Sequence, residues 1–180
     1  GLFFLLPLLY LIYKNVLKKK NQLNLIVIFN LILFQGLLGW YMVKSGLVNN
    51  VSVSHYRLSL HLSLAFIILS SLVWIYMNYV RKTYKLFFIK NNNFLSIQIL
   101  FILIFFQIII GAFVSGLDAG KIYQTWPLMN YTYFPNDTLF VKLSDYFDFN
   151  NHSLVQFFHR NLAYIIFILT IYIGFKIFNK

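Results

Sequence analysis

Long runs of hydrophobic residues, separated by more polar stretches, dominate this chain of 180 residues. Four runs are long enough to cross a lipid bilayer as helices, because a span needs about 20 residues at ~1.5 Å per residue. These runs cover residues 23–43, 58–80, 94–114 and 154–177. The stretches between them are residues 14–22, 44–57, 81–93 and 115–153. The pattern predicts an all-α fold, a polytopic transmembrane helical bundle.

A shorter hydrophobic run opens the chain at residues 1–13. It is too short to span a bilayer, no basic residue precedes it, and no small-residue cleavage site follows it. A signal peptide is therefore a poor interpretation. We interpret the run as the inner half of a longer helix, and the chain as an internal fragment of a longer protein.

The composition supports a membrane protein and excludes several other classes. Hydrophobic residues make up 60% of the chain, and its mean hydropathy is +0.73. The chain has no cysteine, which excludes disulfides, thiolate metal sites and covalent c-type haem attachment within it. No Ser/His/Asp set, phosphate-binding glycine loop or carboxylate pair within the bilayer supports a hydrolase or a nucleotide-binding protein.

The formal net charge of +11 follows the predicted topology. Ten of the fifteen basic residues fall on one side of the membrane, which the positive-inside rule makes cytoplasmic. They are Lys14, Lys18, Lys19, Lys20, Arg81, Lys82, Lys85, Lys90, Lys176 and Lys180. The other five basic residues and all four acids fall on the opposite side. Topology therefore accounts for the charge, and nucleic acid is not a predicted partner.

Two histidines lie about one turn inside predicted spans, and each begins the pattern His-x-x-Leu-Ala: His61 and His159. An ionisable residue at membrane depth is costly and usually functional. Imidazole binds metals, and an alanine one turn below leaves room for a flat group such as a porphyrin. The alternative is a histidine bonded to a nearby backbone carbonyl, but two in matching settings favour a duplicated metal-ligand site. His55 and His152 lie in or beside loops and are predicted to be solvated.

Arginine is scarce, with three residues against twelve lysines, yet it recurs beside these histidines. Arg57 precedes His61 by four residues, and Arg160 directly follows His159. The planar guanidinium binds carboxylates with two parallel hydrogen bonds. Both arginines are therefore candidate clamps for haem propionates.

A second repeat lies in the helices that precede the histidines. Its copies read Gln35-x-x-x-Gly39 and Gln107-x-x-x-Gly111, and each leads to a Ser-Gly-Leu exit. We expect the glutamines to form interhelical hydrogen bonds, and the glycines, with Gly36, to allow close helix approach or to leave space for a ring. The unit of the repeat is therefore an outward helix, an outer loop and an inward helix.

The long loop at residues 115–153 has its own turn and anchor signals. Asp118 with Gly120 predicts a turn, and Trp126 before a proline is typical of an anchor at the membrane surface. Loops of this length are often functional. The loop is either a membrane-surface cap or a lid over a bound group, with Asp118, Lys121 and Trp126 as candidate lid residues.

These segments resemble the haem A synthases of mitochondria and proteobacteria. The resemblance rests on residues 35–47, 54–62, 111–129 and 155–160, including Asp-Ala-Gly-Lys and Trp-Pro-Leu-Met in the loop. It covers nearly the whole chain, from the end of the family's second helix through its sixth.

The resemblance implies an eight-helix protein made of two pseudo-symmetric four-helix halves. Residues 1–80 would belong to the N-terminal, substrate-haem half, residues 81–93 would form a cytoplasmic linker, and residues 94–180 would belong to the C-terminal, haem b half. The family's partner histidines, on its second and eighth helices, and an acidic residue thought to be catalytic would lie outside this chain. The chain would then hold one ligand of each pair and be inactive alone.

The family oxidises a ring methyl of haem O to a formyl group, which gives haem A for terminal oxidases. The resemblance implies that His61 and Arg57 bind the substrate haem, and that His159 and Arg160 bind a haem b cofactor through its iron and propionates. It implies a bacterial or mitochondrial inner membrane, with the histidines toward the periplasm or intermembrane space. A separate electron donor protein is a further implied partner, and haem O synthase and a second copy of the protein are others. Two alternatives share some features: a di-haem b cytochrome that leaves its haem unmodified, and a transporter built from repeated hairpins.

Overall fold

The computed structural model describes residues 1–46, 53–81, 95–137 and 142–179. These residues are mostly helical, and within them β-structure is limited to an isolated bridge between Met129 and Thr132. The elements are α1 (Leu2–Tyr13), α2 (Lys19–Gly46), α3 (His55–Val80), α4 (Leu95–Gly116), η2 (Ala119–Lys121), η3 (Leu143–Phe147) and α5 (His152–Phe178). The predicted all-α fold is confirmed.

Each predicted span is found as one helix, which extends two or three residues beyond the hydrophobic run at the end that carries the histidines. Polar residues set two of these ends. The side chain of Asn151 accepts a hydrogen bond from the backbone N–H of Leu154 at 3.1 Å and so caps the start of α5. Just after α4, Asp118 adopts a left-handed φ of 54°, which ends the helix and begins the outer loop. Of the predicted linker at 81–93, only Arg81 is among the described residues; Phe94 and Lys180 also lie outside them.

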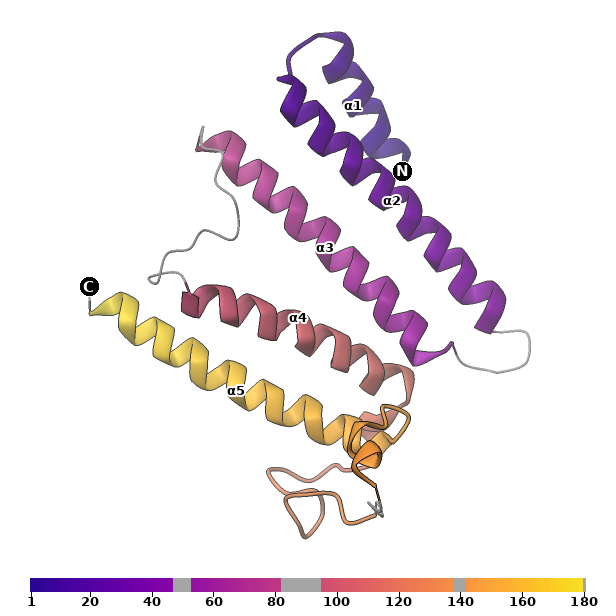
Figure 1. The fold of residues 1–180 in the computed structure, drawn as a ribbon, viewed down its shortest axis with the longest axis vertical. Coiled ribbons are helices and arrows are strands. Elements are labelled where there is room, and N and C mark those ends of the chain that lie inside the picture. Colours follow the sequence, from indigo (N-terminus) through magenta and orange to yellow (C-terminus); the bar gives the residue numbers. More distant parts are fainter. Residues whose placement is uncertain (47–52, 82–94, 138–141, 180) are drawn as a thin grey trace.

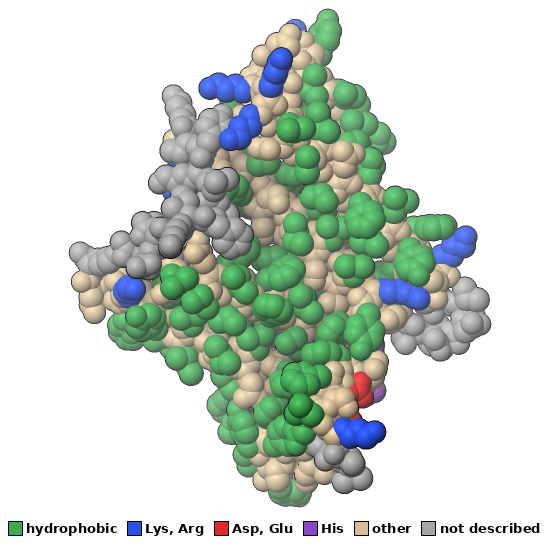
Figure 2. All heavy atoms as spheres, in the orientation of Figure 1, with side chains coloured by type: hydrophobic (Ala, Val, Ile, Leu, Met, Phe, Trp, Pro, Cys, Tyr) green, Lys and Arg blue, Asp and Glu red, His purple; other side chains and the backbone are tan. Residues whose placement is uncertain are grey.

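Helices α2, α3, α4 and α5 are long and apolar enough to cross a membrane. Only a small part of each apolar segment is buried inside the structure, so most hydrophobic side chains face outward. On the face seen in Figure 2, hydrophobic side chains cover the helices, and lysines and arginines gather near their ends. A helix that is hydrophobic all round needs an apolar environment. The chain is therefore a multi-pass membrane protein.

The helices lie in a row in chain order, with alternating directions (Figure 1). α2 packs on α3, α3 on α4, and α4 on α5, while α1 lies against α2. Because the directions alternate, α3 and α5 both begin at the same end of the helical bundle. His61 and His159 are both in the early turns of these helices, so they share this end with the outer loop.

Candidate functional site

His61 on α3 is held by a glutamine from the neighbouring helix α2. The side-chain amide nitrogen of Gln35 donates a hydrogen bond to the backbone carbonyl of His61 at 3.0 Å. The same nitrogen lies 3.2 Å from Nε2 of the His61 ring. A Cβ added at Gly39, one turn along α2 from Gln35, would lie 3.1 Å from Cε1 of this ring. The imidazole therefore lies closer to α2 than a side chain at residue 39 would ordinarily allow.

The same arrangement recurs at His159 on α5. The amide nitrogen of Gln107 on α4 donates to the backbone carbonyl of His159 at 3.2 Å. It also lies 3.1 Å from Nδ1 and 3.3 Å from Nε2 of the ring. A Cβ at Gly111 would again lie 3.1 Å from Cε1 of the imidazole. The sequence repeat is thus a repeat of contacts, and the expected interhelical hydrogen bonds of both glutamines are confirmed.

Each imidazole could serve as one axial ligand of a haem iron. Among the described residues, no group of three or more His, Cys, Asp or Glu could hold a metal ion. A haem needs only one or two axial ligands from the protein, because the porphyrin supplies the others. Nδ1 of His61 is buried without a hydrogen-bond partner, as are the Oε1 atoms of Gln35 and Gln107. Such atoms are uncommon in proteins and call for an explanation, such as a redox or catalytic role or a bound ion or water.

The two arginines beside these histidines have different surroundings. Arg57 donates to Oγ of Ser45 at 2.6 Å, and its guanidinium carbon lies 5.1 Å from the ring centroid of Tyr41. Arg160 instead donates to three loop carbonyls, those of Tyr123 at 2.6 Å, Thr125 at 2.8 Å and Leu128 at 3.5 Å. Arg160 is therefore a loop anchor in this structure, and it would have to share or exchange these bonds to bind a carboxylate.

The first part of the outer loop is fixed to α5 by a second side chain, Gln156. Its amide nitrogen donates to the carbonyls of Tyr123 at 2.9 Å and Gly120 at 3.5 Å, and its Oε1 accepts from the backbone N–H of Tyr123 at 3.3 Å. Gln156 is buried, and Ala119, Tyr123 and Met129 form the buried interior of the loop. Sequence analysis missed Gln156, although a glutamine on an apolar helix three residues before His159 is a usable signal.

The three candidate lid residues point away from this interior. Asp118 and Lys121 form an ion pair at 2.8 Å on the surface, with side chains 73% and 77% exposed. Trp126 is 75% exposed. The structure does not bring these residues to either histidine, so their role in a lid stays a prediction.

Asp137 joins the loop to the start of α5. Its carboxylate accepts hydrogen bonds from Oγ of Ser153 at 2.6 Å and from the hydroxyl of Tyr123. Burial raises the pKa of Asp137, but these two hydrogen bonds, together with one from its own backbone, outweigh burial and hold the pKa below its usual value. Burial and the bond to Asp137 raise the pKa of Tyr123. The network is therefore complete when Asp137 is ionised and Tyr123 is neutral.

This network predicts how stability depends on pH. Because the pKa of Asp137 is lowered by folding, its contribution is complete above the ordinary value of about 4 and is lost as pH falls through the folded-state value. The thermal midpoint of the wild-type full-length protein should exceed that of Asp137→Asn near neutral pH, and the gap should close below about pH 4. Asp118→Asn, which removes an exposed carboxylate, should change the midpoint little at any pH. A gap for Asp137→Asn that stays constant from neutral to acid pH would contradict the prediction.

The prediction for the other two histidines is half right. His152 is exposed, as predicted. His55 is wrongly predicted as solvated, since only 8% of it is exposed. Its ring packs edge-on against Phe113 of α4, with centroids 5.5 Å apart, and its backbone lies against Gly116. The absence of a side chain at residue 116 brings α3 close to α4 and buries the imidazole.

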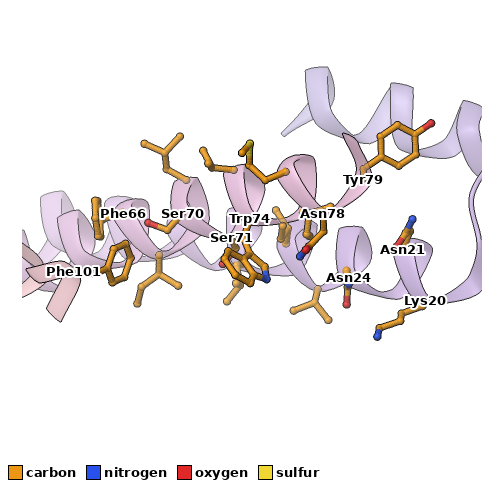
Figure 3. Close-up of a pocket in the computed structure, with 18 of the residues that line it drawn as sticks. Lys20, Asn21, Asn24, Phe66, Ser70, Ser71, Trp74, Asn78, Tyr79 and Phe101 are labelled. Carbon is orange, nitrogen blue, oxygen red and sulfur yellow. The ribbon is translucent and has the colours of Figure 1, made fainter. Parts of the chain in front are cut away.

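A groove of about 950 Å³ lies along α2 and α3 at the end away from the histidines. Figure 3 shows its aromatic part, with Phe66 and Phe101, and its polar end, with Lys20, Asn21 and Asn24. None of the candidate site residues lines it. The groove is thus separate from both histidine sites.

Comparison with known proteins gives a consistent result along the chain. A family model described as COX15-CtaA, cytochrome oxidase assembly protein, matches residues 1–180. The heme A synthase of Pelagibacter ubique is 45% identical over 184 aligned positions, covering 100% of this chain and 53% of that protein. The heme A synthase of Wolbachia sp. subsp. Brugia malayi is 43% identical, covering 94% of this chain and 51% of its own. That of Flavobacterium psychrophilum is 36% identical, covering 98% and 52%.

The chain thus spans about half the length of the curated relatives it matches. No solved structure matches it. The resemblance seen in the sequence is confirmed over the full chain by a family model and by several relatives. The chain belongs to the COX15-CtaA family of cytochrome oxidase assembly proteins.

Proposed function

We propose that the protein containing this chain is a haem A synthase, which oxidises a ring methyl of haem O to a formyl group. The observation that carries the proposal is the repeated site, an imidazole held by a glutamine and seated against a glycine, at one end of a membrane bundle. Relatives that align over most or all of this chain carry the name heme A synthase. The protein would be an oxidoreductase whose product supplies terminal oxidases.

The residues present fit a haem at each site. Each imidazole can supply one axial ligand, and each adjacent glycine lets the ring pack closely against the neighbouring helix. In this proposal His61 binds the substrate haem O and His159 binds a haem b cofactor. Bound haem would supply the redox chemistry through its iron. Residues 1–80 would then belong to the substrate half and residues 94–180 to the cofactor half.

The rest of the chain would position the haems and exclude water. Arg57, close to the start of α3, would bind a propionate in exchange for its hydrogen bond to the hydroxyl of Ser45. Arg160 would bind a propionate from a loop that it also holds in place. The apolar faces of the helices would surround the porphyrin and its isoprenoid tail. The reaction also needs an external redox partner, for which we propose a separate electron donor protein.

We further propose an inner-membrane location, bacterial or mitochondrial, with both histidines toward the outer side. The support is the distribution of charge. Five basic residues lie at the helix ends away from the histidines: Lys14, Lys18, Lys19, Lys20 and Arg81. Haem O synthase is a proposed partner, since the substrate is apolar and would be passed within the membrane. A second copy of this protein is another proposed partner.

The test is production of haem A by the full-length protein. The protein is expressed in cells that make haem O and lack their own haem A synthase, and extracted haems are separated by reverse-phase chromatography. We expect a haem A peak, absent from cells that carry the empty vector. Bound haem without any haem A would favour a di-haem cytochrome, and a purified protein without haem would favour a transporter; either result overturns the proposed function.

A further inference from the structure

The two glutamines contact their histidines in a way that fixes the orientation of the side-chain amide. A backbone carbonyl only accepts hydrogen bonds, so the atom that faces the carbonyl of His61 must be Nε2 of Gln35 and not Oε1. The same reasoning fixes Gln107 against the carbonyl of His159. Each amide is thus tied to the helix backbone that carries the imidazole, independently of the ring.

This orientation determines which ring nitrogen of His61 carries the proton. Nε2 of Gln35 is a donor, so the ring nitrogen that it faces, Nε2 of His61, must be unprotonated. In the neutral imidazole the proton is then on Nδ1. Nδ1 of His61 is therefore a buried donor, and the structure gives it no partner.

Each glutamine also has an unused acceptor beside the ring. Oε1 of Gln35 and Oε1 of Gln107 are both buried without a hydrogen-bond partner. A buried donor and a buried acceptor without partners each cost free energy. A hydrogen bond between the two would remove both costs. A ring orientation that directs Nδ1–H at Oε1 would give both atoms a partner and would leave Nε2 free to bind a metal.

At the second site the amide contact does not depend on one particular ring nitrogen. The amide nitrogen of Gln107 is 3.1 Å from Nδ1 and 3.3 Å from Nε2 of His159, so neither ring nitrogen is preferred. The amide stays on the backbone carbonyl whichever nitrogen faces it. The amide can therefore contact either ring nitrogen while it keeps its hydrogen bond to the backbone of α5.

We propose that Gln35 and Gln107 are positioning residues that accept the Nδ1–H of His61 and His159 while Nε2 of each ring faces the haem. This inference rests on the proposed haem-binding function. Metal-bound histidines usually donate their second ring N–H to an acceptor, which orients the ring and makes it a stronger ligand. Here a neutral amide, held by its other end on the histidine backbone, does this at both sites.

Electron-rich ligands stabilise the oxidised iron, so the midpoint potential of the haem reports on this hydrogen bond. In the full-length protein, Gln107→Leu removes the acceptor and should raise the midpoint potential of the His159 haem and weaken haem retention by about 10-fold or more. Gln107→Glu keeps an acceptor and should leave the potential at or below the wild-type value. The potential is measured by optical redox titration of the purified protein.

Gln98→Leu is the matched control, since Gln98 lies on the same helix nine residues earlier, about 13 Å along the axis. It should leave the potential unchanged. Equal shifts for Gln107→Leu and Gln107→Glu, or no shift beyond the control, would overturn the inference. If wild-type protein binds no haem, the proposed function itself fails, so the two failures are distinguishable. Gln35→Leu and Gln35→Glu repeat the test at the His61 haem.

Discussion

The full-length protein carrying His159→Ala is expected to lose its cofactor haem and to keep the haem bound through His61. The imidazole is a metal-ligating side chain that lies directly against Gln107 and Gly111. An alanine there leaves no ligand nitrogen from α5 and opens space beside Gly111. Removal of one axial ligand is a large loss, because the protein supplies at most two such ligands to a haem iron.

The measurement is haem per protein by pyridine haemochrome, with extracted haems identified by chromatography. His152→Ala is the matched control: it changes the same residue type on the same helix, seven residues earlier, where the side chain is exposed. The control should retain wild-type haem content. Unchanged haem content in His159→Ala would refute its role as a ligand.

His61→Ala should give the opposite loss, since the two sites lie on different helix pairs, α2 with α3 and α4 with α5. Haem b should remain in the protein and haem O should be lost. If both variants lost both haems, the sites would be coupled, and assigning one haem to each histidine would be wrong.

The helices and their paired histidines were predictable because their signals are local. A run of about 20 hydrophobic residues specifies a membrane helix wherever it occurs. A histidine within such a run is rare enough to stand out, and its repetition at His61 and His159 marks a pair. The four-residue spacing from Gln35 to Gly39 also places both on one face of a helix. That spacing predicted an interhelical contact, although not its partner.

The role of Arg160 could not be predicted in the same way. Its acceptors are backbone carbonyls of residues 32 to 37 positions away. Every residue has a backbone carbonyl, so an acceptor of this kind cannot be recognised from its residue type. Arg57 and Arg160 have the same predicted role, yet the first contacts a helix and the second holds a loop. Only the folded path of the loop separates them.

The burial of His55 was missed because it depends on a side chain that is absent. Gly116 lies 61 positions along the chain, and it resembled the other small residues of the apolar helices. In the structure a Cβ at Gly116 would lie 2.7 Å from Cβ and 2.8 Å from Cα of His55. The close contact joins α3, which carries His61, to α4, whose Gln107 contacts His159.

Gly116→Ala is therefore expected to be strongly destabilising. The atoms that a new Cβ would meet include backbone, which cannot rotate away as a flexible side chain can, so α3 and α4 must move apart. Overpacking of this kind typically costs about 1–3 kcal/mol. The same separation should expose His55 and its contact with Phe113. The expected result is a lower thermal midpoint of the purified full-length protein.

Gly174→Ala provides the matched control, because a Cβ at Gly174 of α5 would meet nothing within 4 Å. Alanine is the better helix former by about 1 kcal/mol, so the control should be neutral or slightly stabilised. Gly116→Ala gains the same helix propensity, and any fall in its midpoint below that of Gly174→Ala measures the lost contact between α3 and α4. Equal midpoints would mean that the two helices can separate at no cost, and that residue 116 does not set their spacing.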